Sequence, residues 1–165
     1  MRITLNMLFL FFTASLVGCK DDDLTLPPAT STGAGTFGCL IDGQVYIPSG
    51  AYSAPLVHVA SNMIVVSGGS ANVNLQLTVR DTTEVIVENR LYLFNQKNIS
   101  CYYYSLNDKD DCHYSDTPVS GYIKFSKIDF VNNIFSGVFE FSAYCISCDK
   151  TINVTEGRFD IREDR

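Results

Sequence analysis

Cysteines carry most of the chemistry that the residue types and spacings of this chain suggest. Cys101 and Cys112 are separated by ten residues centred on a polar loop, so a hairpin would align them for a cross-strand disulfide. Cys145 and Cys148 form a CxxC pair between strand-like sequences, which favours a structural disulfide closing a hairpin loop over a redox motif opening a helix. Cys39 lies in an apolar strand, where a buried free thiol behaves as a small hydrophobe; a bridge to Cys101 or Cys145 is the alternative.

Residue types for catalysis or metal binding are few outside these cysteines. His113 lies close to Asp111 and Asp116, a spacing that permits a base oriented by a carboxylate and equally permits a polar loop. A zinc site would combine His113 with the cysteines of both predicted disulfides, but only one CxxC knuckle is present. We predict no metal site and no catalytic residues. The alternative is a small envelope hydrolase that uses His113 with Asp111 and Asp116, or a thiol-redox protein that uses Cys145 and Cys148.

Two further groups have an ordinary structural explanation. His58 lies in an alternating strand and is more typical of a packed or surface histidine than of a general base. Tyr102–Tyr104 would place two rings on one strand face and one on the other, which indicates sheet packing or, alternatively, stacking on sugar rings. The sequence contains no Trp, which argues against a carbohydrate site.

The first eighteen residues form a segment of their own. Arg2 is their only charged residue, and the apolar stretch that ends at Val17 is shorter than the roughly 20 residues that cross a bilayer as a helix. This profile predicts a cleaved signal peptide over residues 1–18. The LVGC at its end resembles the bacterial lipobox, in which a small residue precedes a cysteine whose thiol receives diacylglycerol. We therefore predict a covalent lipid on Cys19 and no other cofactor.

Residues 19–35 are predicted to be a flexible lipid-anchored tether, because their Asp, Pro, Thr, Ser and Gly content offers nothing to a core. Such a tether would extend to at most about 55 Å. Lys20, Asp21, Asp22 and Asp23 follow the predicted lipid site directly and resemble the export signal of Bacteroidetes-type lipoproteins; otherwise they only keep the anchor region extended. We expect an outer-membrane protein facing the cell surface, with the periplasmic face as the alternative.

The charge balance restricts the partners. The chain carries a net charge of −6, and removal of residues 1–18 takes away Arg2 and no acidic residue, which leaves −7. Such a chain offers no basic stripe for phosphates, so we predict no nucleic-acid partner. The expected partners are the membrane, through the lipid, and a glycan, peptide or envelope protein of unknown identity.

From Thr36 onward, apolar residues recur at every second position and no stretch has a helical stripe. This pattern predicts a single all-β domain over residues 36–165, an antiparallel β-sandwich or flattened barrel of about nine to eleven short strands. Short polar or Gly-containing breaks separate the expected strands of the middle region, which read LVHVA, MIVVSG, NVNLQLTVR, EVIV and RLYLF.

Three hairpins are expected from turn residues. Asp42-Gly43 is a strong turn signal that would pair Leu40 with Val45. Asn132-Asn133 would turn a second hairpin with Phe130 facing Phe135, and the slip in apolar phase before it predicts a β-bulge near Ser126-Lys127 that puts Phe125 opposite Phe139. Glu156-Gly157 would turn the last hairpin, with Val154 opposite Phe159 and with Arg158, Asp160 and Arg162 on a solvated face.

Sequence at both ends of the mature chain resembles a known family. The segments LPPATSTGAGTFGCLIDG and KIDFVNNIFSGVFEF, followed by TEGRFDI, are similar to Bacteroidetes outer-membrane lipoproteins known only as a domain of unknown function. The resemblance implies a signal peptide, a lipid anchor and a β-rich domain, and it assigns no activity. The Asp81-Thr82-Thr83 motif also resembles the O-glycan acceptor of such envelope proteins, with Thr82 as the modified residue. We therefore expect a non-enzymatic binding or structural lipoprotein.

Overall fold

The computed structural model describes residues 24–50, 53–94, 96, 98–105, 113–115, 119–146 and 148–163. These residues form eleven strands, each paired antiparallel with its neighbours, and the all-β prediction is confirmed. Among them no helix has the length and apolarity that crossing a membrane requires. The strands are β1 (Thr36–Ile41), β2 (Gln44–Tyr46), β3 (Leu56–Ala60), β4 (Met63–Gly69), β5 (Val73–Arg80), β6 (Leu91–Leu93), β7 (Ile99–Ser105), β8 (His113–Ser115), β9 (Val119–Asp129), β10 (Ile134–Cys145) and β11 (Lys150–Arg162).

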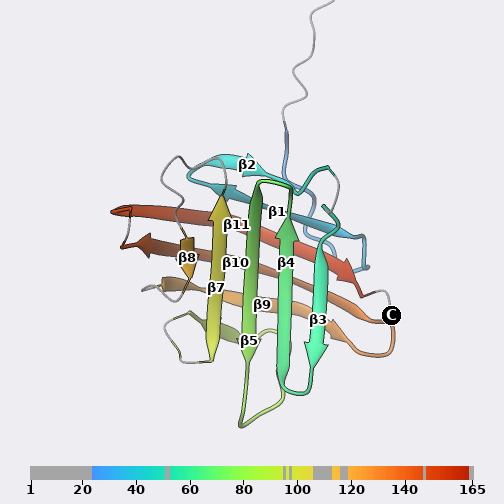
Figure 1. Ribbon diagram of the computed structural model, residues 1–165. Helices are drawn as coiled ribbons and strands as arrows, with labels where there is room; N and C mark the ends of the chain where they lie inside the picture. The colour runs from blue at the N-terminus through green and yellow to red at the C-terminus, as the bar shows by residue number, and fades with distance from the viewer. Residues whose placement is uncertain are drawn as a thin grey trace, which may run out of the picture.

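The strands form two sheets packed face to face, which makes the fold a sandwich. The first sheet has the order β2-β1-β11-β10-β9-β6, and the second has the order β3-β4-β5-β7-β8. Strands of the two sheets cross at a steep angle in Figure 1. The first sheet joins the N-terminal hairpin to the three long C-terminal strands, whereas most of the second sheet comes from the middle of the chain.

Large aromatic rings of the first sheet pack over glycines. Gly137 on β10 lies between Phe125 on β9 and Phe159 on β11, and the two rings meet edge to face above it with centroids 5.8 Å apart. Any Cβ at Gly137 would come within 2.8 Å of the Phe159 ring. In the second sheet, Gly68 makes the same kind of room for Phe37, a buried residue of β1. The core therefore depends on glycines opposite phenylalanines as well as on apolar alternation.

The hairpin of β9 and β10 confirms the predicted bulge and corrects the predicted register. The pairing shifts between Lys127 opposite Ser136 and Phe125 opposite Gly137, so Ser126 is the extra residue. The pairing predicted for Phe125 and Phe139 is wrong by two residues, because the turn has four residues rather than two: Phe125 pairs with Gly137, and Phe139 pairs with Ile123. Asp129 accepts hydrogen bonds from the backbone N–H of residues 131 and 132, at 3.1 and 2.9 Å, and this holds a four-residue turn at positions 130–133.

The hairpin predicted at Glu156-Gly157 is wrong, because β11 runs without a turn from Lys150 to Arg162. Its pairing with β10 shifts by one residue there, from Phe139 opposite Gly157 to Phe141 opposite Val154. Glu156 has φ = +51°, the conformation that a hairpin turn would need and that this bulge uses instead. Both halves of the strand remain paired because β1 and β10 flank them on either side.

The remaining hairpin and the middle strands follow the sequence closely. Leu40 pairs with Val45 across the Asp42-Gly43 turn, as predicted, and both turn residues have positive φ. The EVIV segment is not a strand: the hydroxyl of Tyr92 accepts a hydrogen bond from the N–H of Val87 at 2.8 Å and so takes up a donor that a neighbouring strand would use.

Candidate functional site

Residues 24–35, called the N-terminal strap below, lie on the outer face of the first sheet. Thr30 Oγ1 donates a hydrogen bond of 2.6 Å to the carboxylate of Asp160 on β11, and the backbone N–H groups of Thr32 and Gly33 donate at 2.9 and 2.7 Å. Ser136 on β10 donates a further bond of 2.7 Å from beneath. Gly33 has φ = +76°, a conformation that glycine adopts without strain and that aims its N–H at the carboxylate.

Asp160 is buried, with 1% of its surface exposed, although β11 presents it on the face opposite to the core. Burial alone would raise the pKa of this carboxyl group. The hydrogen bonds that the carboxylate accepts lower the pKa of Asp160 by more, so that it lies well below its usual range. The group is therefore charged at neutral pH, and among the described residues neutral hydrogen-bond donors stabilise this charge.

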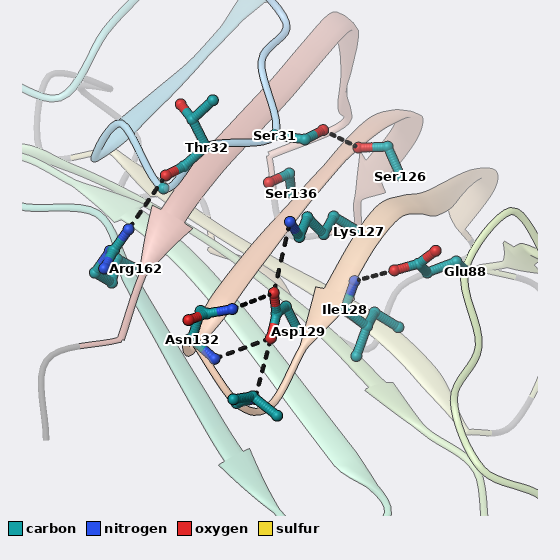
Figure 2. Close-up of polar contacts among 12 residues, drawn as sticks. Ser31, Thr32, Glu88, Ser126, Lys127, Ile128, Asp129, Asn132, Ser136 and Arg162 are labelled. Carbon is teal, nitrogen blue, oxygen red and sulfur yellow. Dashed lines mark hydrogen bonds and ion pairs between the residues drawn. The ribbon is translucent and has the colours of Figure 1, made fainter.

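Further contacts hold the strap along its length. Ser31 and Ser126 share a hydrogen bond of 3.2 Å, and Arg162 Nη2 donates to the carbonyl of Thr32 at 3.4 Å (Figure 2). Arg158 reaches the carbonyl of Pro27 at 3.5 Å. This differs from the free tether predicted up to residue 35 and from the domain start predicted at Thr36. The solvated face predicted for Asp160 is likewise covered, because the strap lies over it.

The predicted CxxC disulfide is not formed. The sulfurs of Cys145 and Cys148 are 3.5 Å apart, whereas a disulfide needs about 2.05 Å. Cys145 ends β10 with its side chain buried, and Cys148 is disulfide-bonded. The two residues are thus neighbours in space, but they do not form the bridge that their spacing suggested.

The other cysteines lie in strands. Cys39 is a free thiol on β1 with none of its surface exposed, as predicted, and burial raises its pKa to about 12. Cys101 is buried on β7. Tyr104 of that strand pairs with His113, and Cys101 lies three residues before Tyr104. This register does not place Cys101 opposite Cys112, so it does not support the predicted bridge between them. Cys112 itself lies outside the described residues.

The candidate catalytic group cannot be assembled from the described residues. Asp111 and Asp116 lie outside them, and only the backbone of His113 is described, in β8. His58 is exposed on β3, the edge strand of the second sheet. Within the described part of the chain, no three His, Cys, Asp or Glu side chains are grouped as a metal site would require.

The tyrosine run and the possible glycan acceptor lie on ordinary strand and turn positions. Tyr103 is buried against the core, while Tyr102 and Tyr104 are half-buried on the other face of β7, which matches sheet packing. Asp81 accepts hydrogen bonds from the backbone N–H of Thr83 at 3.0 Å and of Glu84 at 2.9 Å, which fixes a turn. Thr82 is exposed at the top of that turn, and its glycosylation stays a prediction.

A pocket of about 410 Å³ lies beside the strap, where β1 begins and β11 ends. Phe37 and Ile161, both buried core residues, are part of its lining, and Arg162 is the single charged residue in it. The β2–β3 connection supplies the opposite wall. The lining residues are Pro27, Gly35, Thr36, Phe37, Ile47, Pro48, Ser53, Ala54, Pro55, Ile161 and Arg162.

Sequence reasoning found neither this pocket nor the buried Asp160. Asp160 alternates with Phe159 and Ile161, so its position on the non-core face was correctly predicted, but burial of that face depends on strap residues 130 positions earlier in the chain. The only local signal was the Thr and Ser content of the strap, which is equally typical of a linker. The pocket likewise joins three segments that are far apart in the sequence.

Two packed antiparallel sheets with a small pocket at one end define the class, an all-β sandwich module. The chain belongs to the family described as "Domain of unknown function (DUF6252)", whose model matches residues 35–160. No curated protein gives a significant match to the chain, and no solved structure does. The family match includes Asp160 but neither Arg162 nor most of the strap.

Proposed function

We propose that the protein is an outer-membrane lipoprotein of the Bacteroidetes type, anchored by a lipid on Cys19, whose sandwich domain is a non-enzymatic binding or structural module. The observation that carries the proposal is the LVGCKDDD sequence at positions 16–23, directly before the docked strap. A small residue before the cysteine and an apolar run upstream are what lipid attachment and signal-peptide cleavage need. The cleaved segment is residues 1–18.

The docked strap supports a short connection between lipid and domain. Pro27 is already in contact with the first sheet, since a Cβ on Gly38 of β1 would meet its ring at 2.8 Å. The chain from Cys19 to Pro27 can extend to roughly 28 Å at most, about half of the reach expected for a free tether up to residue 35. The domain is thus held near the lipid headgroups.

Lipid attachment is tested by feeding cells an alkyne-tagged fatty acid and following the tag on the purified protein. The wild-type chain should be labelled, and Cys19→Ala should lose the label completely and accumulate at the larger, unprocessed mass. Cys39→Ala is the matched control, because it also removes one cysteine but leaves Cys19 in place. Labelling of Cys19→Ala equal to wild type would refute the anchor.

Surface display is tested with an external protease on intact cells. Lys20, Asp21, Asp22 and Asp23 are proposed as the export signal, so the wild-type domain should be cut in sealed cells. Replacement of Asp21–Asp23 by Ala should leave fatty-acid labelling unchanged while the domain becomes protected until the cells are lysed. A wild-type protein that is cut only after lysis belongs to the periplasmic face instead.

A thiol-redox protein is the second candidate, and one observation favours it. The sulfur of Cys145 lies 3.5 Å from that of Cys148, which is already disulfide-bonded, so attack by the Cys145 thiolate on Cys148 would exchange the bridge and release the present partner as a thiol. A hydrolase built on His113, Asp111 and Asp116 has no such support. With dithiothreitol as the electron donor, faster reduction of a model protein disulfide in the presence of the purified chain, lost in Cys145→Ser, would favour the redox function over the binding function.

A further inference from the structure

The pocket beside the strap has stiff walls that combine apolar side chains with the polar residues Thr36 and Ser53. Pro27, Pro48 and Pro55 come from the strap and from the β2–β3 connection, and their rings fix the backbone at each position. Phe37 and Ile161 are both buried in the sandwich core, with 2% and 1% of their surfaces exposed. A ligand would meet a surface that needs little ordering, so the entropic cost of binding is small. The volume of about 410 Å³ lies within the range of small-molecule sites.

Arg162 gives this pocket its charge preference. It is the last residue of β11 and exposed, and it is the only ionised group among the lining residues. Its guanidinium donates one hydrogen bond, of 3.4 Å, to the carbonyl of Thr32, as Figure 2 shows. Among the described residues it forms no ion pair. Most of its five N–H donors therefore remain available, in a planar arrangement that matches a carboxylate.

The strap completes the pocket. Pro27 and Gly35 belong to the strap and form part of the wall, and the bond from Arg162 to Thr32 ties this lining residue to the strap. The neighbouring residue Asp160 fixes the same strap through four of its five hydrogen bonds. The chain has a net charge of −6, so most of its surface repels anions. Arg162 is a positive charge in the pocket lining, and it favours binding of an anion there.

We propose that this pocket binds a small monocarboxylic acid with a compact apolar body. The apolar body lies against the prolines, Phe37 and Ile161, and the carboxylate pairs with Arg162. The site deepens the binding function proposed above and rests on that part of it; it does not depend on the lipid anchor.

The test is a titration of the chain from residue 19 onward, carrying Cys19→Ser, which retains every described residue and needs no detergent. The probe is 4-phenylbutyrate, with its neutral amide 4-phenylbutyramide as the uncharged analogue, and binding is followed by chemical-shift changes of the protein. Saturable binding of the acid and at least tenfold weaker binding of the amide are expected, since the charge-assisted hydrogen bonds are lost.

Two arginine variants separate the pocket from general charge. Arg162→Gln should weaken binding of the acid at least tenfold and leave binding of the amide unchanged. Arg80→Gln is the matched control, because Arg80 is also exposed and forms no ion pair among the described residues, but lies on the second sheet. It should bind like the parent chain. Ala54→Trp, which fills the pocket from the β2–β3 connection, should abolish binding of both probes.

The outcomes that overturn the proposal are specific. Absence of saturable binding of the acid, equal binding of acid and amide, or equal weakening by Arg162→Gln and Arg80→Gln would each reject it. Any of these results leaves the fatty-acid labelling of Cys19 unaffected, so failure of the pocket is distinguishable from failure of the anchor. Folding of each variant is checked by its unfolding midpoint before titration.

Discussion

Asp160 and Ser136 lie opposite each other on β11 and β10, and both are buried on the face of the first sheet that points away from the core. Ser136 Oγ donates a hydrogen bond of 2.7 Å to Asp160 Oδ1, which satisfies the carboxylate from the sheet side. The strap satisfies it from the other side. A polar pair on an outer sheet face has thus become the attachment point of a separate segment.

Replacing Asp160 by Asn should release the strap and destabilise the domain. In asparagine an NH2 group replaces one of the two carboxylate oxygens that accept hydrogen bonds from the N–H groups of Thr32 and Gly33. Two donors then face each other, so at least one buried hydrogen bond is lost. We expect the free energy of unfolding, measured by urea titration, to fall by about 2–4 kcal/mol. A protease of broad specificity should also cleave within residues 24–35 faster than in the wild-type chain.

Asp42→Asn is the matched control for this variant. Asp42 accepts a hydrogen bond of 2.8 Å from the N–H of Asn153, but at an exposed turn. Its replacement should change the free energy of unfolding by less than about 1 kcal/mol and leave the strap resistant to cleavage. Equal effects of the two variants would show that Asp160 has no special role.

Acidification should weaken the same attachment. The pKa of Asp160 is depressed in the folded chain, so its contribution to stability is present above the unfolded-state pKa of about 3.9 and is lost as pH falls through the folded-state value. The wild-type free energy of unfolding should therefore fall more steeply than that of Asp160→Asn as pH is lowered from about 5 towards 2. Urea titrations at several pH values measure both slopes. Parallel slopes would contradict the assignment.

Gly68→Ala should strain the core, and Gly69→Ala should not. A Cβ on Gly68 would lie 2.4 Å from the ring of Phe37, whereas a Cβ on Gly69 meets nothing closer than 3.7 Å. The first variant should lose about 1–3 kcal/mol of stability, and adding Phe37→Leu should recover part of the loss because the smaller side chain makes room. The measurement is urea unfolding of the two single variants and of Gly68→Ala with Phe37→Leu. Equal losses for the two alanine variants would show that ring packing is not the cause.

Cys39 should resist alkylation in the folded chain. Burial raises the pKa of its thiol to about 12, so almost no thiolate is present at pH 8, and no part of the side chain is exposed. Peptide mapping after iodoacetamide treatment should show modification of Cys39 only when the chain is unfolded in urea. Rapid modification under native conditions would mean that β1 opens locally.

Local patterns predicted the parts of the fold that depend on a few neighbouring residues. The Asp42-Gly43 turn and the bulge at Ser126 follow from turn chemistry and apolar phase, and both were predicted correctly. Glu156-Gly157 carries the same local signal as a turn, yet it forms a bulge because β1 and β10 pair with both sides of it. Burial of Asp160 and the pocket at Arg162 depend on the strap, so no local pattern specifies them.

The position of the strap also determines how the domain responds to mechanical load. A pull on the N-terminal end, as from a membrane anchor, reaches the hydrogen bonds of Asp160 before it reaches β1, which begins at Thr36. The contact between Arg158 and Pro27 and then the Asp160 bonds would break before the strands separate, which would release about twelve residues, roughly 40 Å of chain, while the aromatic core remains packed. The strap is therefore expected to detach and lengthen under load, so that the force on the sandwich falls before its strands separate.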